Sequence, residues 1–463
     1  MKRSLAVRDG ERYPGAMDQT KAQNLLSRLI NKATAAGADT ADGVIVNGVS
    51  HGVSWRLGQL EDVERSESLD LGVRLMFGAR SASVSTTDLS TSGLDDLVDR
   101  CASMAKAAPE DPYVGLAPKD QLACAPFADL DLGDYDDPGT DALKSLAGEC
   151  EDAALGVDGV VNSSGASASY GEGRKWLMTS HGFFGETGGS SHSVSVSVLA
   201  EDANGMERDY DFDSKTHRGD LRAPAKIGLE AGRRAVARLS PRKIKSQKAP
   251  VLFDNHLSRS IIGHLAGAIN GAAIARGVSF LKDKMGEQIF AENINIIDDP
   301  FIKRGHGSRP FDGEGVAAEK LKLIDNGVLT SWILNAAHGR QLGLRSNGRA
   351  TRGVGGAPGA SSTNMFLQPG LQTPDELMKS VGTGLLVTDM FGPQVNANTG
   401  DYSVGCSGFW LEDGAPAYPV SEITIAGNLL EMFANLTPAN DLEFRGASNA
   451  PTILLGEMTV AGD

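Results

Sequence analysis

Polar side chains that could do chemistry gather in one block of the chain, residues 382–428. There, short apolar runs alternate with glycine-rich turns, and Asp401, Tyr402, Ser403 and Glu422 stand beside the runs. Such carboxyl and hydroxyl groups are costly to bury without partners. Placed at the ends of strands, they can bind a peptide backbone or orient a water molecule. The block therefore predicts a polar cleft built on a sheet.

Each of these residues also has a structural explanation. Asp401 could cap a turn, and Tyr402 could pack its ring while its hydroxyl finds a partner. Glu422 lies just ahead of an expected helix, where a carboxylate can serve as a cap. The residue types alone leave the functional and the structural interpretation open.

Common nucleotide-binding and nucleophile motifs do not account for the block. The chain has no GxxxxGK[ST] phosphate loop and no GxSxG nucleophile elbow, and residues 405–408, GCSG, are one residue too short for the latter. Residues 313–318, GEGVAA, resemble a dinucleotide-binding GxGxxA. They do not open a helix after a buried strand, so we interpret them as a plain turn.

Histidine spacing argues against a metal site on one helix. The sequence has neither HExxH nor HExxxH, and His256 and His264 share an expected helix over residues 256–276. Their separation corresponds to a rise of about 12 Å along a helix. Two ligands of one zinc ion lie only about 3–4 Å apart. We therefore expect a helix-end histidine and a packed histidine, and no metal ligand.

Composition limits the class of protein. The 463 residues suggest two domains, and the net charge of −15 disfavours a nucleic-acid partner. No apolar run is long enough to span a membrane, and the start of the chain does not resemble a secretory signal. Cys101 and Cys150 fall on apolar helix faces, which predicts buried free thiols. We expect a cytoplasmic protein.

The N-terminal half should combine a sheet with flanking helices. In residues 191–200, SHSVSVSVLA, serine and valine alternate with period two, so one face of that strand should be apolar and the other polar. Ser92 could cap the second helix. Helices are expected at 18–37, 92–108, 140–155 and 220–239, and strands within 43–77 and 160–213.

A short basic segment separates the two expected domains. Residues 241–250 carry four basic side chains between two prolines. A charge run of this length is usually solvated surface, so we interpret it as a linker in preference to a docking patch. The predicted order is a loose N-terminus over 1–17, an α/β domain over 18–240, the linker, and a β-rich domain over 251–463.

Antiparallel signals dominate the C-terminal half. Asn326-Gly327 stands between two apolar runs and predicts a hairpin with a type I′ turn. Thr373 and Glu376 form a capping box that opens a short helix. The predicted fold class is α+β, with a curved antiparallel sheet and few helices in this second domain.

Several motifs in this half resemble those of the PmbA/TldE proteins, the branch of the TldD/PmbA peptidase family that lacks HExxxH. They are dense in the C-terminal half, and the N-terminal half matches more loosely through GVRLMFG at 72–78. The C-terminal set is VSFLKDKMGEQI (278–289), FDGEGV (311–316), LIDNGVLTSWIL (323–334), GRQLGL (339–344), GTGLLVT (382–388), TGDYSVGCSGFW (399–410) and YPVSEITIAGN (418–428).

The resemblance makes the lack of zinc-binding residues informative. The TldD branch carries HExxxH at the start of its C-terminal domain and completes the zinc site with a cysteine near its C-terminus. Here the matching segment near 262–267 holds His264 alone, and the tail 444–458 has no cysteine; Cys406 lies in another motif. A zinc-bound water needs three protein donors and a base. The resemblance therefore implies no catalytic residue and no metal of its own.

The family implies a role within a complex. Its TldD–TldE heterodimer is cytoplasmic, encloses a peptide channel and places zinc in the TldD subunit. We expect this chain to be a non-catalytic subunit that shapes the channel for unfolded peptides, paired with a TldD-like partner or with itself. Asp401, Tyr402, Ser403 and Glu422 then become candidates for the channel wall or the subunit interface. The alternatives are an autonomous hydrolase with an unrecognised site, and a scaffold without a role in proteolysis.

Overall fold

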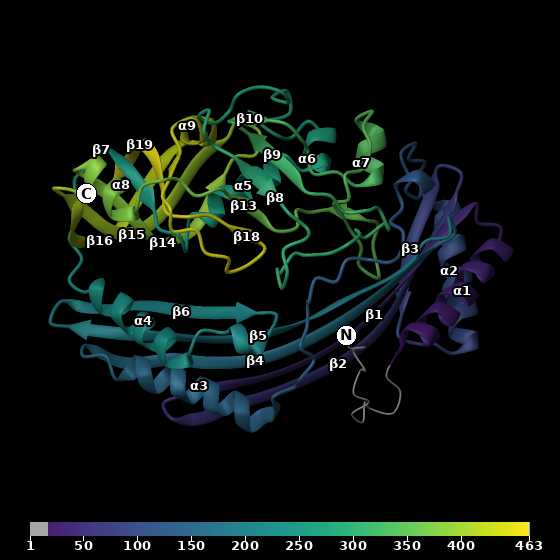
Figure 1. Cartoon of the computed structure of the whole chain (residues 1–463), viewed down its shortest axis with the longest axis horizontal. Coiled ribbons are helices and arrows are strands. Elements are labelled where there is room, and N and C mark those ends of the chain that lie inside the picture. Colours follow the sequence, from purple (N-terminus) through teal and green to yellow (C-terminus); the bar gives the residue numbers. More distant parts are fainter. Residues whose placement is uncertain (1–16, 463) are drawn as a thin grey trace, which may run out of the picture.

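The fold was obtained as a computed structural model, which describes residues 17–462 apart from the side chains at 393 and 394. An N-terminal layered unit lies beneath a C-terminal unit that is rich in short strands (Figure 1). This confirms the predicted α+β class with two domains. The predicted loose N-terminus lies almost entirely outside the described residues. No helix in the described part is long and apolar enough to cross a membrane.

The N-terminal unit is built on one long, curved antiparallel sheet, the N-terminal sheet. Its strand order is β3-β2-β1-β4-β5-β6. The strands are β1 (Thr40–Arg56), β2 (Gln59–Phe77), β3 (Arg80–Thr86), β4 (Val160–Thr179), β5 (Phe184–Asp202) and β6 (Gly205–Lys215). β3 pairs only with the second half of β2, from Leu71 to Phe77.

All four long helices cover the same face of this sheet. α1 (Gln19–Ala35) and α2 (Thr91–Ala107) pack on one end, and α3 (Gly139–Leu155) and α4 (Pro224–Ala237) pack on the other. The two short 3-10 helices are η1 (Lys119–Gln121) and η2 (Arg218–Asp220). The predicted alternation in β5 is confirmed, because Val194, Val196 and Val198 are buried under α3 and α4. Cys101 and Cys150 are buried free thiols, as expected.

Helix starts follow local capping chemistry. The Asp18 carboxylate accepts from the backbone N–H of Lys21, and the Ser90 hydroxyl accepts from that of Gly93. The cap of α2 is therefore Ser90, and the expectation that Ser92 fills this role was wrong by two residues. The capping box at Thr373 and Glu376 is present.

The C-terminal unit contains a closed ring of strands. β15 pairs with β14 and β16, β14 with β7, β7 with β19, and β19 again with β16. These strands, with the short β17, are β7 (Gln247–Phe253), β14 (Gly384–Val395), β15 (Asp401–Glu412), β16 (Ala415–Asn428), β17 (Thr437–Pro438) and β19 (Ile453–Ala461). We call this ring the C-terminal barrel. β7 and β14 are parallel, and the other neighbours are antiparallel.

A second, smaller sheet and short helices surround the barrel. The sheet has the order β10-β9-β8-β13-β18. Its strands are β8 (Ile296–Asp298), β9 (Leu321–Asp325), β10 (Val328–Leu329), β13 (Met365–Leu367) and β18 (Ser448–Asn449); β11 (Ala350–Thr351) pairs with β12 (Gly359–Ala360). The predicted hairpin at Asn326-Gly327 joins β9 to β10. The helices are α5 (Arg259–Ala268), α6 (Gly271–Ala275), α7 (Ala336–Gln341), α8 (Pro374–Val381) and α9 (Leu429–Ala434).

Two details of the second half differ from expectation. The single helix expected over 256–276 is two helices: α5 ends at Ala268 with Ile269 as its C-cap, and the side chain of Asn270, whose backbone is extended, caps α6. His256 lies ahead of α5, so the two histidines do not share a helix. β7 begins at Gln247, within the segment interpreted as a linker. The domain boundary at 241–250 stays a prediction.

Candidate functional site

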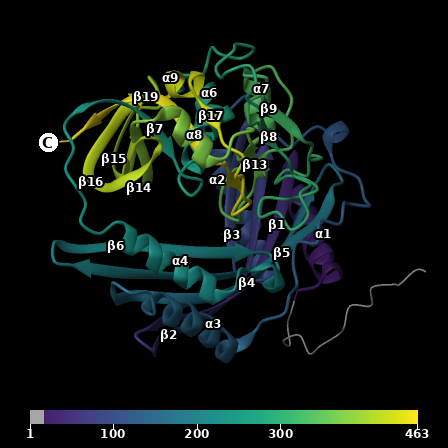
Figure 2. The ribbon, with the colours of Figure 1, turned by 60° about the vertical axis from the view of Figure 1, so that its left-hand side comes forward.

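The face of the N-terminal sheet that the helices leave uncovered is lined with small residues. Across β1, β4 and β5 the register places Ser54 beside Ser167 and Ser167 beside Ser195. The hydroxyl oxygens of the latter two lie 2.9 Å apart. Ser167 is exposed, whereas the next residue, Ala168, is buried on the helix side. We call this face the serine floor. It faces the C-terminal unit (Figure 2).

Part of the serine floor lies in an open groove of about 440 Å³, which Ser54, Ser167, Ser195 and Ser197 help to line. Hydroxyl groups donate and accept hydrogen bonds in several directions, because the hydroxyl rotates. Such a surface can bind extended main chain without selecting particular side chains.

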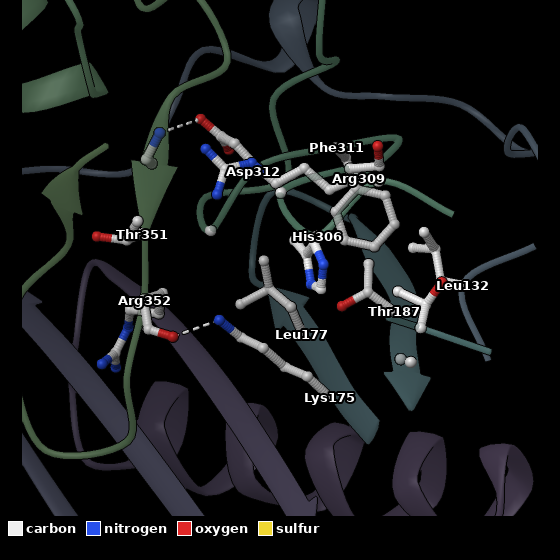
Figure 3. A pocket seen from close by; sticks show the side chains of 18 of the residues that line it. Leu132, Lys175, Leu177, Thr187, His306, Arg309, Phe311, Asp312, Thr351 and Arg352 are labelled. Carbon is white, nitrogen blue, oxygen red and sulfur yellow. Dashed lines mark hydrogen bonds between the residues drawn. The ribbon is translucent and has the colours of Figure 1, made fainter. Parts of the chain in front are cut away.

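A deeper cavity of about 570 Å³ lies between the same sheet and loops of the C-terminal unit. We call it the interdomain groove. On the sheet side it is lined by Lys175 and Leu177 of β4 and by Thr187 of β5. On the opposite side it is lined by the loop segments 305–313 and 350–353. Figure 3 shows these side chains converging from both units.

Two glycines let the loops approach the sheet. A Cβ atom on Gly72 of β2 would stand 2.1 Å from the carbonyl oxygen of Val354, and one on Gly185 of β5 would stand 2.5 Å from the ring of Phe311. Any side chain at these two positions would push the loops away. Gly72 belongs to the GVRLMFG segment, so that motif includes one of the two glycines that let the loops approach the sheet.

Asp312 holds the two loops in place. One of its carboxylate oxygens accepts from the backbone N–H groups of Glu314 and Val316, at 2.8 and 2.9 Å. The other accepts from the N–H of Ala350, at 2.8 Å. Burial raises the pKa of Asp312, and these three hydrogen bonds oppose that effect. The GEGVAA segment is thus a turn fixed by Asp312, as interpreted from the sequence.

Buried charges join the two units behind the groove. The Asp42 carboxylate accepts from Arg74 Nε at 2.6 Å and from Arg352 Nη2 at 3.0 Å, and all three residues are nearly fully buried. Burial opposes ionisation of Asp42, but the two guanidinium groups hold its pKa below the usual range. Burial raises the pKa of the neighbouring Glu314 to about 7. Arg352 belongs to the C-terminal unit, so this network fixes the units relative to each other.

Two basic side chains face the interdomain groove itself. Lys175 is half-buried, and its ammonium group donates to the backbone oxygen of Arg352. Burial, together with Arg352 and Arg309, lowers the pKa of Lys175 to about 8. Arg309 donates from Nη2 to the Ser361 oxygen at 3.0 Å. Its Nε is buried and has no hydrogen-bond partner among the described residues.

A second set of charges links the units away from the groove. Arg238, just past α4, donates to Asp389 of β14 at 2.9 Å and to the hydroxyl of Ser407 in β15 at 2.8 Å. It also donates to Asp209 of β6 at 3.3 Å. The N-terminal unit is therefore joined to the C-terminal unit at two separate places, through Arg352 behind the groove and through Arg238 at the C-terminal barrel.

The residues singled out from the sequence lie on the barrel, away from the lining of the groove. Asp401 accepts from the Thr399 hydroxyl at 2.7 Å and from Asn428 at 3.2 Å, and these bonds lower its pKa. Tyr402 is buried, and its hydroxyl lies 3.4 Å from the Met390 sulfur. Ser403 is exposed on β15.

Glu422 has a different role from the one expected. It lies inside β16 with a backbone φ of 55°, where the register with β15 shifts, and it is an ion-pair partner of Lys243. That pairing lowers the pKa of Glu422. The interpretation as a helix cap was wrong, because Asn428 caps α9.

The donors needed for a zinc ion do not converge. In α5 the ring of His264 packs edge-on against that of Tyr402, with centroids 5.8 Å apart, and burial lowers the pKa of His264. His256 accepts from Arg445 at 2.7 Å, and its pKa falls to about 3 through burial. Over residues 17–462 no group of three or more His, Cys, Asp or Glu side chains could hold a metal ion. The residues at the matching helix do not fit zinc.

Sequence reasoning missed Lys175, Arg309 and Arg352. The signal for Lys175 was a lysine on a strand next to buried Trp176 and Leu177. Arg309 precedes FDGEGV, and Arg352 follows β11. Both lie in glycine-rich loops whose sequence shows no hydrophobic periodicity. Their convergence depends on the packing of the two units and cannot be seen in either segment alone.

Comparison with known proteins places these features in a family. Models of three domains described as PmbA/TldA metallopeptidase match the chain: domain 1 at 41–105, the central domain at 133–239 and the C-terminal domain at 246–462. "Metalloprotease PmbA" of Escherichia coli O157:H7 is 38% identical over 455 residues, which cover 96% of this chain and 98% of the relative. A PmbA homolog of Haemophilus influenzae is 36% identical, covering 96% and 97%.

Solved structures share the fold. TldE from Thermococcus kodakarensis superposes with a TM-score of 0.85 at 18% identity, covering 95% of this chain and all of that one. A Bacteroides thetaiotaomicron protein that carries the description of a modulator of DNA gyrase gives a TM-score of 0.89 at 24% identity. It covers 97% of this chain and all of that one.

Proposed function

The chain belongs to the PmbA/TldD metallopeptidase family, and on that premise we propose that it is the non-catalytic subunit of a cytoplasmic peptidase complex. In this proposal it holds unfolded peptides in a channel, and a TldD-like partner supplies zinc and hydrolysis. It needs no cofactor of its own. The observation that carries the proposal is the contrast between α5, which has one packed histidine, and the open serine floor.

The donor geometry supports assigning hydrolysis to another chain. Zinc hydrolases use three protein ligands with an open fourth position, and a neighbouring acid or base. His264 instead packs on Tyr402, and its Nε2 has no hydrogen-bond partner among the described residues. The relatives carry the name metalloprotease. We attribute that name to the complex in which such a chain works.

The serine floor and the interdomain groove support a channel for peptides. Both lie on the same face of the N-terminal sheet, because the lining residues of β4 and β5 share one parity: Ser167, Lys175 and Leu177, with Ser195 and Thr187 opposite. Ser167 and Lys175 are eight residues apart on β4, which corresponds to about 26 Å along a strand. An extended peptide of about nine residues lying along β4 would therefore reach from the serines to Lys175.

The outer edge of β2 supports a partner surface. β3 covers β2 from Leu71 onward, and among the described strands none pairs with the outer edge of residues 59–70. These residues are largely exposed on both faces, and Leu60 and Val63 are each 41% exposed. An uncovered strand edge can add a strand from another chain. Its acidic residues Glu61, Asp62, Glu64 and Glu67 would repel a second copy, so we favour a TldD-like partner over a homodimer.

One arrangement bears on the alternative of an autonomous hydrolase. Asp134 Oδ1 lies 2.7 Å from His192 Nε2 and 3.3 Å from the Ser190 hydroxyl. The carboxylate therefore stands between serine and histidine. In a catalytic triad the histidine stands between the other two, so that it can take the serine proton. The Ser190 hydroxyl donates instead to the Thr216 oxygen at 2.6 Å. This order favours a structural role.

Measurements of zinc content and peptidase activity test which subunit binds zinc and performs hydrolysis. The chain is purified alone and together with a zinc-bearing TldD-like homologue from the same cells, and bound zinc and hydrolysis of an unfolded polypeptide are measured. We expect neither zinc nor hydrolysis in the chain alone, and hydrolysis in the complex. Thr187→Trp, which fills the groove, should slow hydrolysis by the complex, whereas Lys245→Trp on the exposed connection should not. Stoichiometric zinc and activity in the chain alone, both lost in His264→Ala, would overturn the proposal.

A further inference from the structure

We propose that Lys175 and Arg309 form a subsite in the interdomain groove that binds a carboxylate of the bound peptide. The inference rests on the proposed peptide channel, and it adds the chemistry that the channel recognises. The two residues come from different units: Lys175 from β4 of the N-terminal sheet and Arg309 from a loop of the C-terminal unit. Both line the same cavity (Figure 3).

Unused donors point to an anionic ligand. Arg309 Nε is buried and has no hydrogen-bond partner among residues 17–462, and leaving a buried donor unpaired is unfavourable. The Lys175 ammonium has three donor positions, and the Arg352 oxygen accepts from it. An acceptor placed between the two side chains would satisfy both. The lining also includes Leu177 and Phe311, each almost fully buried, so competing water is partly excluded.

The local charge balance is positive. Lys175, Arg309 and Arg352 line the groove, and Arg74 lies behind it on Asp42. Of the carboxyl groups among them, Asp42 is shared by two arginines, Asp312 accepts three backbone hydrogen bonds, and Glu314 accepts from the backbone N–H of Ala336 at 2.8 Å. Asp312 attracts both Lys175 and Arg309, but its oxygens accept from the backbone. An incoming carboxylate would add a second negative charge and would offer the two side chains free acceptor atoms.

A peptide carboxylate fits this arrangement better than a neutral group. Charge-assisted hydrogen bonds from ammonium and guanidinium to carboxylate are roughly twice as strong as neutral ones. The serine floor leads along β4 to Lys175, so a chain bound there would bring either its C-terminal carboxylate or an acidic side chain to the subsite. The shared chemistry is the carboxylate, and the experiment below separates its two sources.

Fluorescence anisotropy on the full chain tests the subsite with matched labelled peptides. One unstructured alanine- and serine-rich decapeptide, long enough to span the distance from Ser167 to Lys175, is made with a C-terminal acid and with a C-terminal amide. A second, amide-ended pair carries one internal glutamate or glutamine. We expect the acid-ended peptide to bind roughly tenfold more tightly than the amide, or the glutamate peptide to bind roughly tenfold more tightly than the glutamine peptide, or both. The first result identifies the C-terminal carboxylate as the ligand, and the second identifies an acidic side chain.

Variants tie the preference to the two residues. Lys175→Met and Arg309→Met should each remove most of the preference while leaving the amide peptide bound. Lys245→Met, at an exposed position outside the groove, should leave it intact. Lys175→Arg retains the positive charge and should keep the preference, so it tests the subsite even if Lys175→Met does not fold.

The pH dependence gives an independent readout. The groups that face Lys175 are Arg352, Arg309, Asp312 and Asp42, and together with burial they set its pKa at about 8. The preference of the unmodified chain should therefore decline as pH rises through about 8. In Lys175→Arg it should persist, because arginine stays charged.

Two different results would contradict the two proposals separately. Equal binding of acid and amide peptides, and of glutamate and glutamine peptides, at neutral pH would overturn the carboxylate subsite while leaving the channel. If no peptide binds to the chain, and Thr187→Trp does not slow hydrolysis by the complex, the channel itself is wrong.

Discussion

The C-terminal barrel and the interdomain groove use polar residues in opposite ways. In the barrel, Asp401 and Glu422 lie at the surface. They bond to neighbours in the same unit or, for Glu422, to Lys243 in the connection before β7, and these bonds lower their pKa values. At the groove, Lys175 lines the cavity and Glu314, of the other unit, lies behind it, and burial moves the pKa values of both toward neutrality. Perturbed ionisation marks the groove as the place where binding chemistry is possible.

The comparison shows that the most recognisable sequence motifs and the perturbed ionisable groups lie in different parts of the molecule. Residues 399–428 carry the most specific family motifs, yet β14, β15 and most of their neighbours form a ring in which each strand has partners on both sides. Gly408 permits close strand packing, because a Cβ atom there would stand 2.0 Å from the Leu386 oxygen of β14. Because the ring is closed through β16 and β19, a peptide cannot add to it as the next strand over residues 424–426. The motif block is thus better explained as a scaffold.

The largest expected effect comes from the buried pair that supports the groove loops. Arg349 and Asp298 have fully buried side chains, and Asp298 also accepts from the Thr363 N–H at 2.7 Å. Arg349→Met would leave an uncompensated buried carboxylate, so we expect a loss of about 3–5 kcal/mol in the free energy of unfolding. Urea denaturation followed by circular dichroism measures this loss.

A neighbouring surface pair provides the control for that substitution. Lys320 pairs with Asp299 at 2.9 Å, and its side chain is 54% exposed. Lys320→Met should cost less than about 1 kcal/mol. Equal losses in the Lys320 and Arg349 variants would contradict the view that the loops depend on buried charge.

A pH-dependent effect of intermediate size should distinguish the two regions by its sign. The pKa of Glu314 is about 7 in the folded chain, against an ordinary value of 4.5. Its contribution to stability is therefore complete below about pH 4.5 and is lost as pH rises through 7, by up to about 3 kcal/mol. Glu314→Gln should remove this decline in thermal or urea unfolding.

Glu422→Gln is the matched substitution on the barrel. Because Lys243 lowers the pKa of Glu422, the native carboxylate contributes above its ordinary pKa and loses that contribution as pH falls. The Gln variant should lose stability relative to the unmodified chain at neutral pH and regain parity in acid. The same slope in both variants would contradict the distinction.

Sequence patterns predicted the scaffold better than the site. Alternation in β5, the hairpin at Asn326-Gly327 and the capping box at Thr373 depend on neighbours within a few residues, so local rules suffice. Lys175 and Arg309 are 134 positions apart, and they line one cavity because Gly72 and Gly185 let the loops approach the sheet. No local periodicity in the sequence reveals such an arrangement. Tyr402 was correctly interpreted as a packed ring, but its partner, Met390, required the strand register.

The smallest effect is expected from Tyr402→Phe in the barrel. Its hydroxyl is bonded only to the weak acceptor sulfur of Met390 among the contacts the structure gives it, and its ring remains packed on His264 after the substitution. Stability should change by less than about 1 kcal/mol, and the affinity for the acid-ended peptide should stay within twofold, as measured by the same anisotropy titration. Lys175→Met should weaken that affinity roughly tenfold. If Tyr402→Phe weakens it as much, the barrel takes part in binding, and the assignment of the channel to the N-terminal sheet is wrong.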